Sequence, residues 1–253
     1  MTARRVLVVA DLHLDQWKHR GIDPLDALPN AEWAALDGLI VAGDLSNAAM
    51  RKWPRFLGRL AGRMDPARIH VIPGNHDYYG LRLGDDAALA GFCRDHGINL
   101  AQKAEIGIAG QRFLCATLWT DFALPADPAR LTDFARIAGA SGPLSLPEMQ
   151  HLHRAQRDWL DARLAACAGR AIVVSHHVPH PDLLAPGMRA PGAFASDLSA
   201  LMHRHRPQGW LFGHAHDALS LEIAGVPCRN VALGPPAHCT DPGARLRDLI
   251  WRL

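Results

Sequence analysis

Five short apolar segments of the chain end in side chains that can bind a metal ion. The first covers residues 6–10 and leads directly into Asp11 and His13. Short β-branched segments that alternate with longer helical patterns are typical of an α/β fold. In open α/β sheets the ligand site lies beyond the carboxyl ends of the strands, so all five ends can meet at one place. The other four are residues 39–42 before Asp44, 69–72 before Asn75 and His76, 172–174 before His176, and 210–212 before His214 and His216.

The residue types at these strand ends are those of a hydrolytic site with two metal ions. Such a site needs a carboxylate that can bridge both ions, several neutral imidazoles and a few oxygen ligands. Residues i and i+2 of an extended chain point the same way, so Asp11 and His13 can share one ion, as can His214 and His216. Glycine stands directly before Asp44, Asn75 and His214 and allows a sharp turn or a close approach of the backbone. The sequence therefore predicts a metal site with mixed nitrogen and oxygen ligands.

Helical patterns fill much of the chain between these strands. Ser145 and Glu148 form a capping box ahead of a long amphipathic pattern, residues 149–166. Further helices are expected over residues 53–64, 85–96 and 197–205, the last of these capped by Ser196.

Two antiparallel additions to the sheets are expected where short strands flank an Ala-Gly turn. These hairpins pair residues 105–108 with 112–118, and residues 219–223 with 226–233. Residues 122–147 and 179–195 are weakly periodic, and each is long enough to be a functional loop. No internal repeat or linker divides the chain, so a single domain over residues 1–253 is expected.

Composition excludes several classes of protein. Lys and Arg number 27 against 25 Asp and Glu and are scattered, which disfavours binding to nucleic acid or to an anionic membrane. The five cysteines are widely spaced without a Cys-x-x-Cys pair, which disfavours a disulfide framework and a thiolate zinc site. No apolar segment approaches the roughly 18 residues of a membrane span, and no signal peptide is apparent. A cytoplasmic protein is therefore expected.

Taken in order, the strand-end motifs resemble those of the calcineurin-like metallophosphoesterase superfamily. One such motif would be weak evidence, but the chain contains all five at approximately the superfamily's spacing, between residues 11 and 216. They read Asp-Leu-His at 11–13, Gly-Asp at 43–44, Gly-Asn-His-Asp at 74–77, Ser-His-His at 175–177 and Gly-His-Ala-His at 213–216. The resemblance implies an α/β fold of two mixed β-sheets packed as a sandwich flanked by helices, with a dinuclear metal centre at the strand ends.

The resemblance also implies a role for each residue of the motifs. Asp44 would bridge two divalent ions, for which Mn, Fe and Zn all suit the mixed ligands. His76 would be the catalytic histidine and would assist the leaving group after a metal-bridging hydroxide attacks phosphorus. His177 remains an alternative to His176 as ligand. The other implied ligands are Asp11, His13 and His216 for one ion, and Asn75, His176 and His214 for the other.

One position departs from the common pattern of this superfamily. Many members carry Gly-Asp-x-x-Asp, in which the second Asp orients the catalytic histidine, but this chain has Asn47 there. Asn47 can accept a hydrogen bond from His76 but has no charge to raise its pKa. Whether Asp77 takes over this task is left open by the sequence.

The leading hypothesis is a metal-dependent phosphoesterase that acts on a phosphomonoester or phosphodiester of a small molecule or nucleotide. A nuclease is disfavoured because the chain has no concentrated basic segment and no additional domain. A protein phosphatase is disfavoured because the longer signature of that branch ends at Asn47. The alternative from another class is a catalytically silent scaffold that uses the fold to bind partners. The presence of every expected ligand and of His76 argues against it. The oligomeric state is not indicated.

Overall fold

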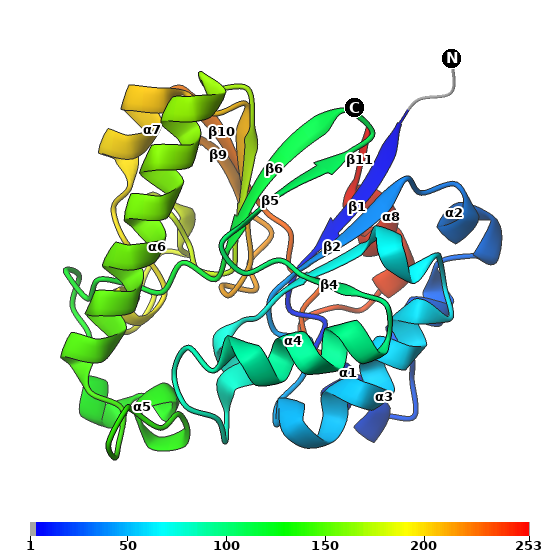
Figure 1. Cartoon of the computed structure of the whole chain (residues 1–253), viewed down its shortest axis with the longest axis horizontal. Coiled ribbons are helices and arrows are strands. Elements are labelled where there is room, and N and C mark those ends of the chain that lie inside the picture. Colours follow the sequence, from blue (N-terminus) through cyan, green and yellow to red (C-terminus); the bar gives the residue numbers. More distant parts are fainter. Residues whose placement is uncertain (1–3, 253) are drawn as a thin grey trace.

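The core of the protein lies between two β-sheets that pack against each other, as the computed structural model of residues 4–252 shows (Figure 1). Along β6 and β7 of the second sheet, Phe113, Cys115 and Val174 face the first sheet, whereas Leu114 and Val173 face away from it. This alternation is the two-residue period of a strand with both faces buried. The predicted fold class, two mixed sheets in a sandwich flanked by helices, is confirmed.

The first sheet has five strands in the order β11-β1-β2-β3-β4. Its four neighbouring strands β1 to β4 are parallel, and β11 pairs with β1 in the antiparallel sense. All five residues of β2 are buried, as expected for a central parallel strand. The strands are β1 (Arg5–Val9), β2 (Gly38–Ala42), β3 (Ile69–Ile72), β4 (Asn99–Leu100) and β11 (Ile250–Arg252).

The second sheet has six strands in the order β5-β6-β7-β8-β10-β9. Its inner strands β6, β7, β8 and β10 are parallel, and the edge strands β5 and β9 are the antiparallel partners expected from the two hairpins. The strands are β5 (Ala104–Ile108), β6 (Gln111–Ala116), β7 (Ile172–Ser175), β8 (Gly209–Phe212), β9 (Ser220–Ile223) and β10 (Val226–Asn230).

Helices cover the outer face of each sheet (Figure 1). Leu160 and Leu164 of α6 pack with Trp210 and Phe212 of the second sheet, and α3 and α4 contact each other on the first sheet's side. Among residues 4–252, no helix is long and apolar enough to cross a membrane. The helices are α1 (Leu14–His19), α2 (Asn30–Ala34), α3 (Ala49–Ala61), α4 (Asp86–Asp95), α5 (Thr132–Arg136), α6 (Leu146–Cys167), α7 (Ser199–His205) and α8 (Pro242–Asp248).

One of three expected helix starts is confirmed, and two are wrong. The capping box of Ser145 and Glu148 is confirmed at the start of α6. The expected start of α3 at residue 53 is wrong, because the helix begins at Ala49 and includes Pro54. The expected cap by Ser196 is also wrong: α7 begins at Ser199, and the Ser196 hydroxyl accepts a hydrogen bond from the backbone N–H of Asp121 instead.

The two long segments expected to be loops are partly helical. Residues 122–147 contain α5 and a 3₁₀ turn, Pro128–Arg130. Residues 179–195 contain two further 3₁₀ turns, Pro181–Leu183 and Pro191–Ala193.

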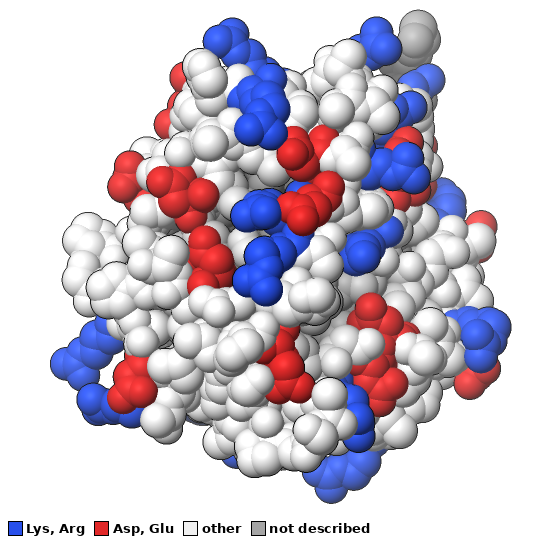
Figure 2. Space-filling view, turned by 60° about the vertical axis from the view of Figure 1, so that its left-hand side comes forward, with Lys and Arg blue, Asp and Glu red and all other residues white. Residues whose placement is uncertain are grey.

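Charged side chains of both signs are interspersed on one face of the protein. On the face drawn in Figure 2, Lys and Arg lie among Asp and Glu rather than in a region of one sign. This face has no basic stripe of the kind that binds a nucleic acid backbone.

A buried carboxylate joins the segments that follow β2 and β3. Asp77 is fully buried, and it accepts hydrogen bonds from the backbone N–H groups of Leu45, Ser46 and Gly74 and from the indole of Trp53, at 2.9 to 3.3 Å. Burial raises the pKa of Asp77 to about 6, although these donors oppose the shift. Asp77 therefore holds the segments after β2 and β3 together. The His76 ring contacts Asn47 and has no hydrogen bond to Asp77.

Replacing this carboxylate is expected to destabilise the fold. Asp77→Ala leaves four buried N–H groups without an acceptor, so the free energy of unfolding should fall by about 3 kcal/mol. Asp77→Asn keeps one acceptor oxygen and should lose less. Urea denaturation measures both changes, with Asp182→Ala, at an exposed position, as the control. A loss below about 0.5 kcal/mol for Asp77→Ala would contradict this account.

Candidate metal centre

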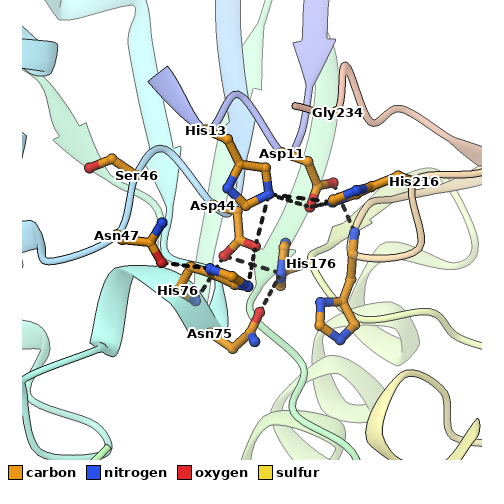
Figure 3. Close-up of polar contacts among 12 residues, drawn as sticks. Asp11, His13, Asp44, Ser46, Asn47, Asn75, His76, His176, His216 and Gly234 are labelled. Carbon is orange, nitrogen blue, oxygen red and sulfur yellow. Dashed lines mark hydrogen bonds and ion pairs between the residues drawn. The ribbon is translucent and has the colours of Figure 1, made fainter. Parts of the chain in front are cut away.

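The carboxyl ends of five strands converge at one edge of the sandwich and bring the seven expected ligands together. Figure 3 labels six of them, all except His214. Among residues 4–252, three groups of side chains place their potential ligand atoms within 4.8 Å of one another. Asp44 belongs to two of these groups, and His13 also belongs to two. The groups are Asp11, His13 and His216; His13, Asp44 and His76; and Asp44, His176 and His214.

Each of the two central carboxylates uses one oxygen to hold the backbone of a neighbouring loop. Asp11 Oδ2 accepts the backbone N–H of His214 at 2.9 Å, and Asp44 Oδ1 accepts that of His76 at 2.9 Å. The second oxygens face imidazoles: Asp11 Oδ1 lies 3.3 Å from His216 Nε2, and Asp44 Oδ2 lies 3.7 Å from His13 Nε2. These oxygens are therefore free to bind an ion.

Close packing explains two of the glycines in the motifs. A Cβ atom at Gly74 would collide with Asp44 Oδ1, and one at Gly213 would collide with Asp11 Oδ2. Any side chain at these positions would displace a carboxylate from the centre. The glycines are thus needed for close approach rather than for positive φ.

Four of the expected ligands have a left-handed backbone conformation. The φ angles are 54° at Asp11, 40° at His13, 56° at Asp44 and 67° at His214. Such conformations cost residues other than glycine roughly 1 to 3 kcal/mol each and persist only where the surrounding structure holds them. Backbone hydrogen bonds between the loops, from Asp11 to Gly43 and from His13 to Asp44, do this here.

Burial keeps three of the imidazoles at the centre neutral; burial also opposes protonation of His216, but the contact with Asp11 raises the pKa of that ring. Burial lowers the pKa of His13 and of His176 to about 3 and that of His214 to about 4, although the charge of Asp11 opposes each shift. Burial would raise the pKa of Asp11, but its contact with His216 and the surrounding imidazoles hold it well below its usual range. Neutral imidazoles and an ionised carboxylate are the forms that bind metal ions.

Asn75 is oriented by Asp133, a residue that the sequence did not single out. Asn75 Nδ2 donates to Asp133 Oδ1 at 2.9 Å, and Asn75 Oδ1 lies 3.0 Å from His176 Nε2. Asp133 also accepts a hydrogen bond from the Tyr79 hydroxyl. Because the carboxylate can only accept, the amide oxygen of Asn75 must face His176 and the centre.

The two adjacent histidines at the end of β7 have different surroundings. His176 Nε2 lies 3.5 Å from Asp44 Oδ1, whereas the ring of His177 lies against that of His214 with their centroids 4.4 Å apart. His177 Nδ1 faces the backbone carbonyl of Thr117. The geometry thus favours His176 over His177 as a ligand.

A further histidine touches the centre from outside. His238 Nδ1 lies 2.9 Å from His216 Nδ1, so it can fix the ring whose Nε2 faces Asp11. His238 follows β10 in a segment without a motif, and no spacing in the sequence pointed to it.

His76 lies at the edge of the cluster. Its Nε2 atom is 3.9 Å from Asp44 Oδ2, and its Nδ1 atom is 2.8 Å from the amide oxygen of Asn47. Burial lowers the pKa of His76, although the charges of Asp133 and Asp11 oppose the shift. Asn47 therefore makes the contact that the usual Asp would make, without its charge.

These residues fit divalent metal ions. Asp11 Oδ1 is buried without a hydrogen-bond donor, and His13 Nε2 and His216 Nε2 face each other at 3.3 Å. Only a proton or a cation between such atoms relieves the repulsion between their lone pairs. The donor set of carboxylates, imidazoles and one amide suits ions such as Mn, Fe or Zn.

The cluster forms the floor of a cavity of about 680 Å³. Apolar side chains from the two long segments, Leu131, Met188 and Phe194, line its wall, and no Lys or Arg does. Tyr79 also lines the cavity, whereas Tyr78 is fully buried.

A two-sheet sandwich with clustered Asp, Asn and His residues at its strand ends defines a class of metal-dependent hydrolases. The family described as calcineurin-like phosphoesterase matches residues 4–218, and the chain belongs to this family. The protein is therefore a metal-dependent phosphoric ester hydrolase.

Solved structures share this fold at low sequence identity. The phosphopantetheinyl hydrolase PptH from Mycobacterium tuberculosis is 16% identical with a TM-score of 0.70, over 99% of this chain and 96% of that one. The protein TT1561 of Thermus thermophilus is 14% identical with a TM-score of 0.57, over 99% of both chains. A putative 5'-nucleotidase from Staphylococcus aureus is 14% identical with a TM-score of 0.52, over 90% of this chain and 48% of that one. No curated protein matches the chain by sequence.

The buried neutral histidines predict that the metal-free protein loses stability in mild acid. In the unfolded chain, histidines take up protons near pH 6.5, but His13, His176 and His214 stay neutral in the folded protein until about pH 3 to 4. The unfolded state then binds more protons, so the free energy of unfolding should fall as the pH falls below 6.5. Four groups with raised pKa values act in the opposite direction, namely Asp44, Asp77, Asp86 and His216. They are fewer than the histidines whose pKa is lowered, which are His13, His70, His76, His153, His176, His177 and His214.

Urea denaturation with a chelator present should show a loss of about 2 kcal/mol between pH 7.5 and pH 5.0. His177→Phe removes one buried imidazole whose pKa burial holds well below its usual value, so its pH dependence should be weaker. A free energy of unfolding that is constant or rises towards pH 5.0 would rule out this explanation.

Proposed function

We propose that this phosphoesterase uses two divalent ions, Mn, Fe or Zn, to hydrolyse a phosphomonoester or phosphodiester of a small molecule or nucleotide. The observation that carries the proposal is the position of Asp44, which forms a group of potential ligands with His176 and His214 and whose Oδ2 atom lies 3.7 Å from His13 Nε2 on the other side. Asp11, His13 and His216 would hold one ion, and Asn75, His176 and His214 the other, with Asp44 shared. We further propose that residues 1–253 act as one domain.

The bound ions would supply Lewis-acid activation of the phosphoryl group and of a water nucleophile. The protein's own residues would orient these groups. Asp44, held by the backbone of His76, would keep both ligand groups at a fixed spacing. His76 presents Nε2 to the cavity and would give a proton to the departing alkoxide.

The residues that line the cavity favour a substrate whose leaving group is an uncharged alcohol. Its lining contains no Lys or Arg to neutralise further phosphates, and Leu131, Met188 and Phe194 offer apolar contact. Asp133 and Asp217 offer hydrogen-bond acceptors and would repel a polyanion. These features disfavour nucleic acid and polyphosphate. They suit a substrate such as a phosphopantetheinyl ester, whose arm is an uncharged chain of amides and on which PptH acts by its name.

A panel of phosphate esters tests the proposal. Protein reconstituted with Mn, Fe or Zn is expected to hydrolyse p-nitrophenyl phosphate, its bis ester or both, and to lose activity with a chelator. Phosphopantetheinyl esters, nucleoside monophosphates and cyclic nucleotides are then compared by kcat/KM. Failure to hydrolyse every ester with every metal would favour the scaffold alternative.

Asp44→Ala is expected to abolish activity and to weaken metal binding, because both proposed ion sites lose the carboxylate that lies between His13 and His176. Activity should fall at least about 100-fold, and the metal content after dialysis should drop from two ions towards none. Asp161→Ala, on the outer side of α6, is the matched carboxylate control and should retain both ions. Full metal content in Asp44→Ala would show that the carboxylate is not shared.

His76→Ala is expected to affect substrates according to their leaving groups. Turnover should fall by roughly 100-fold or more on alkyl esters, which need a proton, and far less on activated aryl phosphates. The exposed His203→Ala on α7 serves as the control and should behave like the unaltered protein. Equal losses on both kinds of ester would exclude a general-acid role for His76.

A further inference from the structure

Asn47 links the proposed catalytic histidine to a carboxylate outside the metal centre. Its amide oxygen lies 2.8 Å from His76 Nδ1, and its amide nitrogen donates to Asp15 Oδ2 at 3.0 Å (Figure 3 shows the first of these contacts). Asp15 lies in α1, two residues beyond His13, and is buried, with 5% of its surface exposed. A carboxylate therefore stands one side chain away from His76, behind Asn47.

The partners of Asp15 fix its hydrogen-bonding role. Lys52 of α3 places its Nζ atom 2.7 Å from Asp15 Oδ2, so Asp15 is held as a carboxylate by a cation. An ionised carboxylate only accepts hydrogen bonds. Asn47 must then turn its NH₂ group towards Asp15.

This orientation of Asn47 decides which nitrogen of His76 carries a proton. With its NH₂ group held by Asp15, Asn47 presents its oxygen to His76 Nδ1, and an amide oxygen only accepts. The proton of the neutral imidazole is therefore on Nδ1. Nε2 faces Asp44 and the cavity with a lone pair. It can take up a proton from solvent and pass this proton to the departing alkoxide, which returns the ring to the same neutral form.

We propose that Asp15 is a positioning residue that acts through Asn47 to fix the ring orientation and the Nδ1–H tautomer of His76. The proposal rests on the role of His76 in the proposed function. Two residues of this chain thus replace the usual aspartate. Asn47 contacts His76 Nδ1, and Asp15 fixes which end of the Asn47 amide makes that contact.

Asp15 also has contacts that stabilise the fold, and these must be distinguished from a positioning role. Asp15 also accepts the backbone N–H of Asn47 at 3.4 Å and occupies the first turn of α1, where an acidic residue stabilises a helix. Neither role depends on which way the Asn47 side chain points. The tautomer of His76 is therefore the property that separates positioning from stabilisation.

Nitrogen-15 NMR of the metal-free protein at pH 8 measures this tautomer directly. Long-range proton–nitrogen correlations distinguish a protonated Nδ1 from a protonated Nε2, and the His76→Ala variant identifies the His76 signal. The expected result for the unaltered protein is the Nδ1–H form. A predominant Nε2–H form, or a mixture, would overturn the proposal without any variant having to fold.

Three variants test the part of Asp15. Asp15→Ala removes the acceptor and is expected to give a mixture of tautomers, with kcat on an alkyl ester lowered about 10-fold and KM changed less than 2-fold. Asp15→Asn keeps an acceptor oxygen and should retain the Nδ1–H form. Asp23→Ala is the matched control, because Asp23 also pairs with a cation of α3, Arg59, but accepts from the backbone N–H of Leu25 rather than from Asn47. An unchanged tautomer in Asp15→Ala, or an equal change in Asp23→Ala, would refute the proposal.

A rescue experiment completes the test. In Asn47→Asp the side chain can only accept, so His76 should keep its proton on Nδ1 whether or not Asp15 is present. Adding Asn47→Asp to Asp15→Ala should therefore restore the tautomer and most of the lost kcat. A double variant with the tautomer mixture of Asp15→Ala would refute a role that acts through Asn47.

The NMR measurement separates this inference from the proposed function. If the metal-loaded protein hydrolysed no ester, the proposed function would fail. The tautomer of His76 in the unaltered and altered proteins would still decide whether Asp15 positions it.

Discussion

The site depends on the way in which Asp11 and Asp44 divide their two oxygens. One oxygen of each accepts a backbone N–H from a different loop, and the other faces the imidazoles. Loops from distant parts of the sequence are thereby held at hydrogen-bonding distance before any ion binds. The left-handed backbone at both aspartates is the cost of this arrangement, and the hydrogen bonds between the loops offset it.

A second rule governs the polar groups around the centre. A side-chain amide can present either its oxygen or its nitrogen to a neighbour, and here a carboxylate fixes the orientation because it accepts only from the nitrogen. Asp133 takes the NH₂ group of Asn75, and Asp15 takes that of Asn47. In both cases the amide oxygen is turned inward, towards His176 in the first and towards His76 in the second. The surrounding acids thus set the direction of hydrogen bonding without entering the centre themselves.

The sequence allowed the prediction of those features that follow from strand geometry. Parallel strands bring their carboxyl ends to one edge, so Asp11, Asp44 and His214 could be expected to meet once their strands were recognised. Residues that reach the site from elsewhere had no such signal. Asp133 comes from α5, a short helix inside a weakly periodic segment, and Asp15 is indistinguishable in sequence from an ordinary acidic residue in a first helical turn. The start of α7 was misplaced because Ser196 accepts a hydrogen bond from Asp121, in the segment after β6, rather than from its own helix.

The two glycines that leave room for the central carboxylates have a consequence for how this site can be lost during evolution. Gly74 and Gly213 donate nothing to an ion, yet the space that a side chain would need at each position is filled by the carboxylate of Asp44 or of Asp11. One added methyl group at either position would push a carboxylate off its place while every donor residue remained in the sequence. Descendants of this chain could therefore keep all seven donors and have no functional centre. Retention of the activity therefore requires these two glycines as much as the residues that bind the ions.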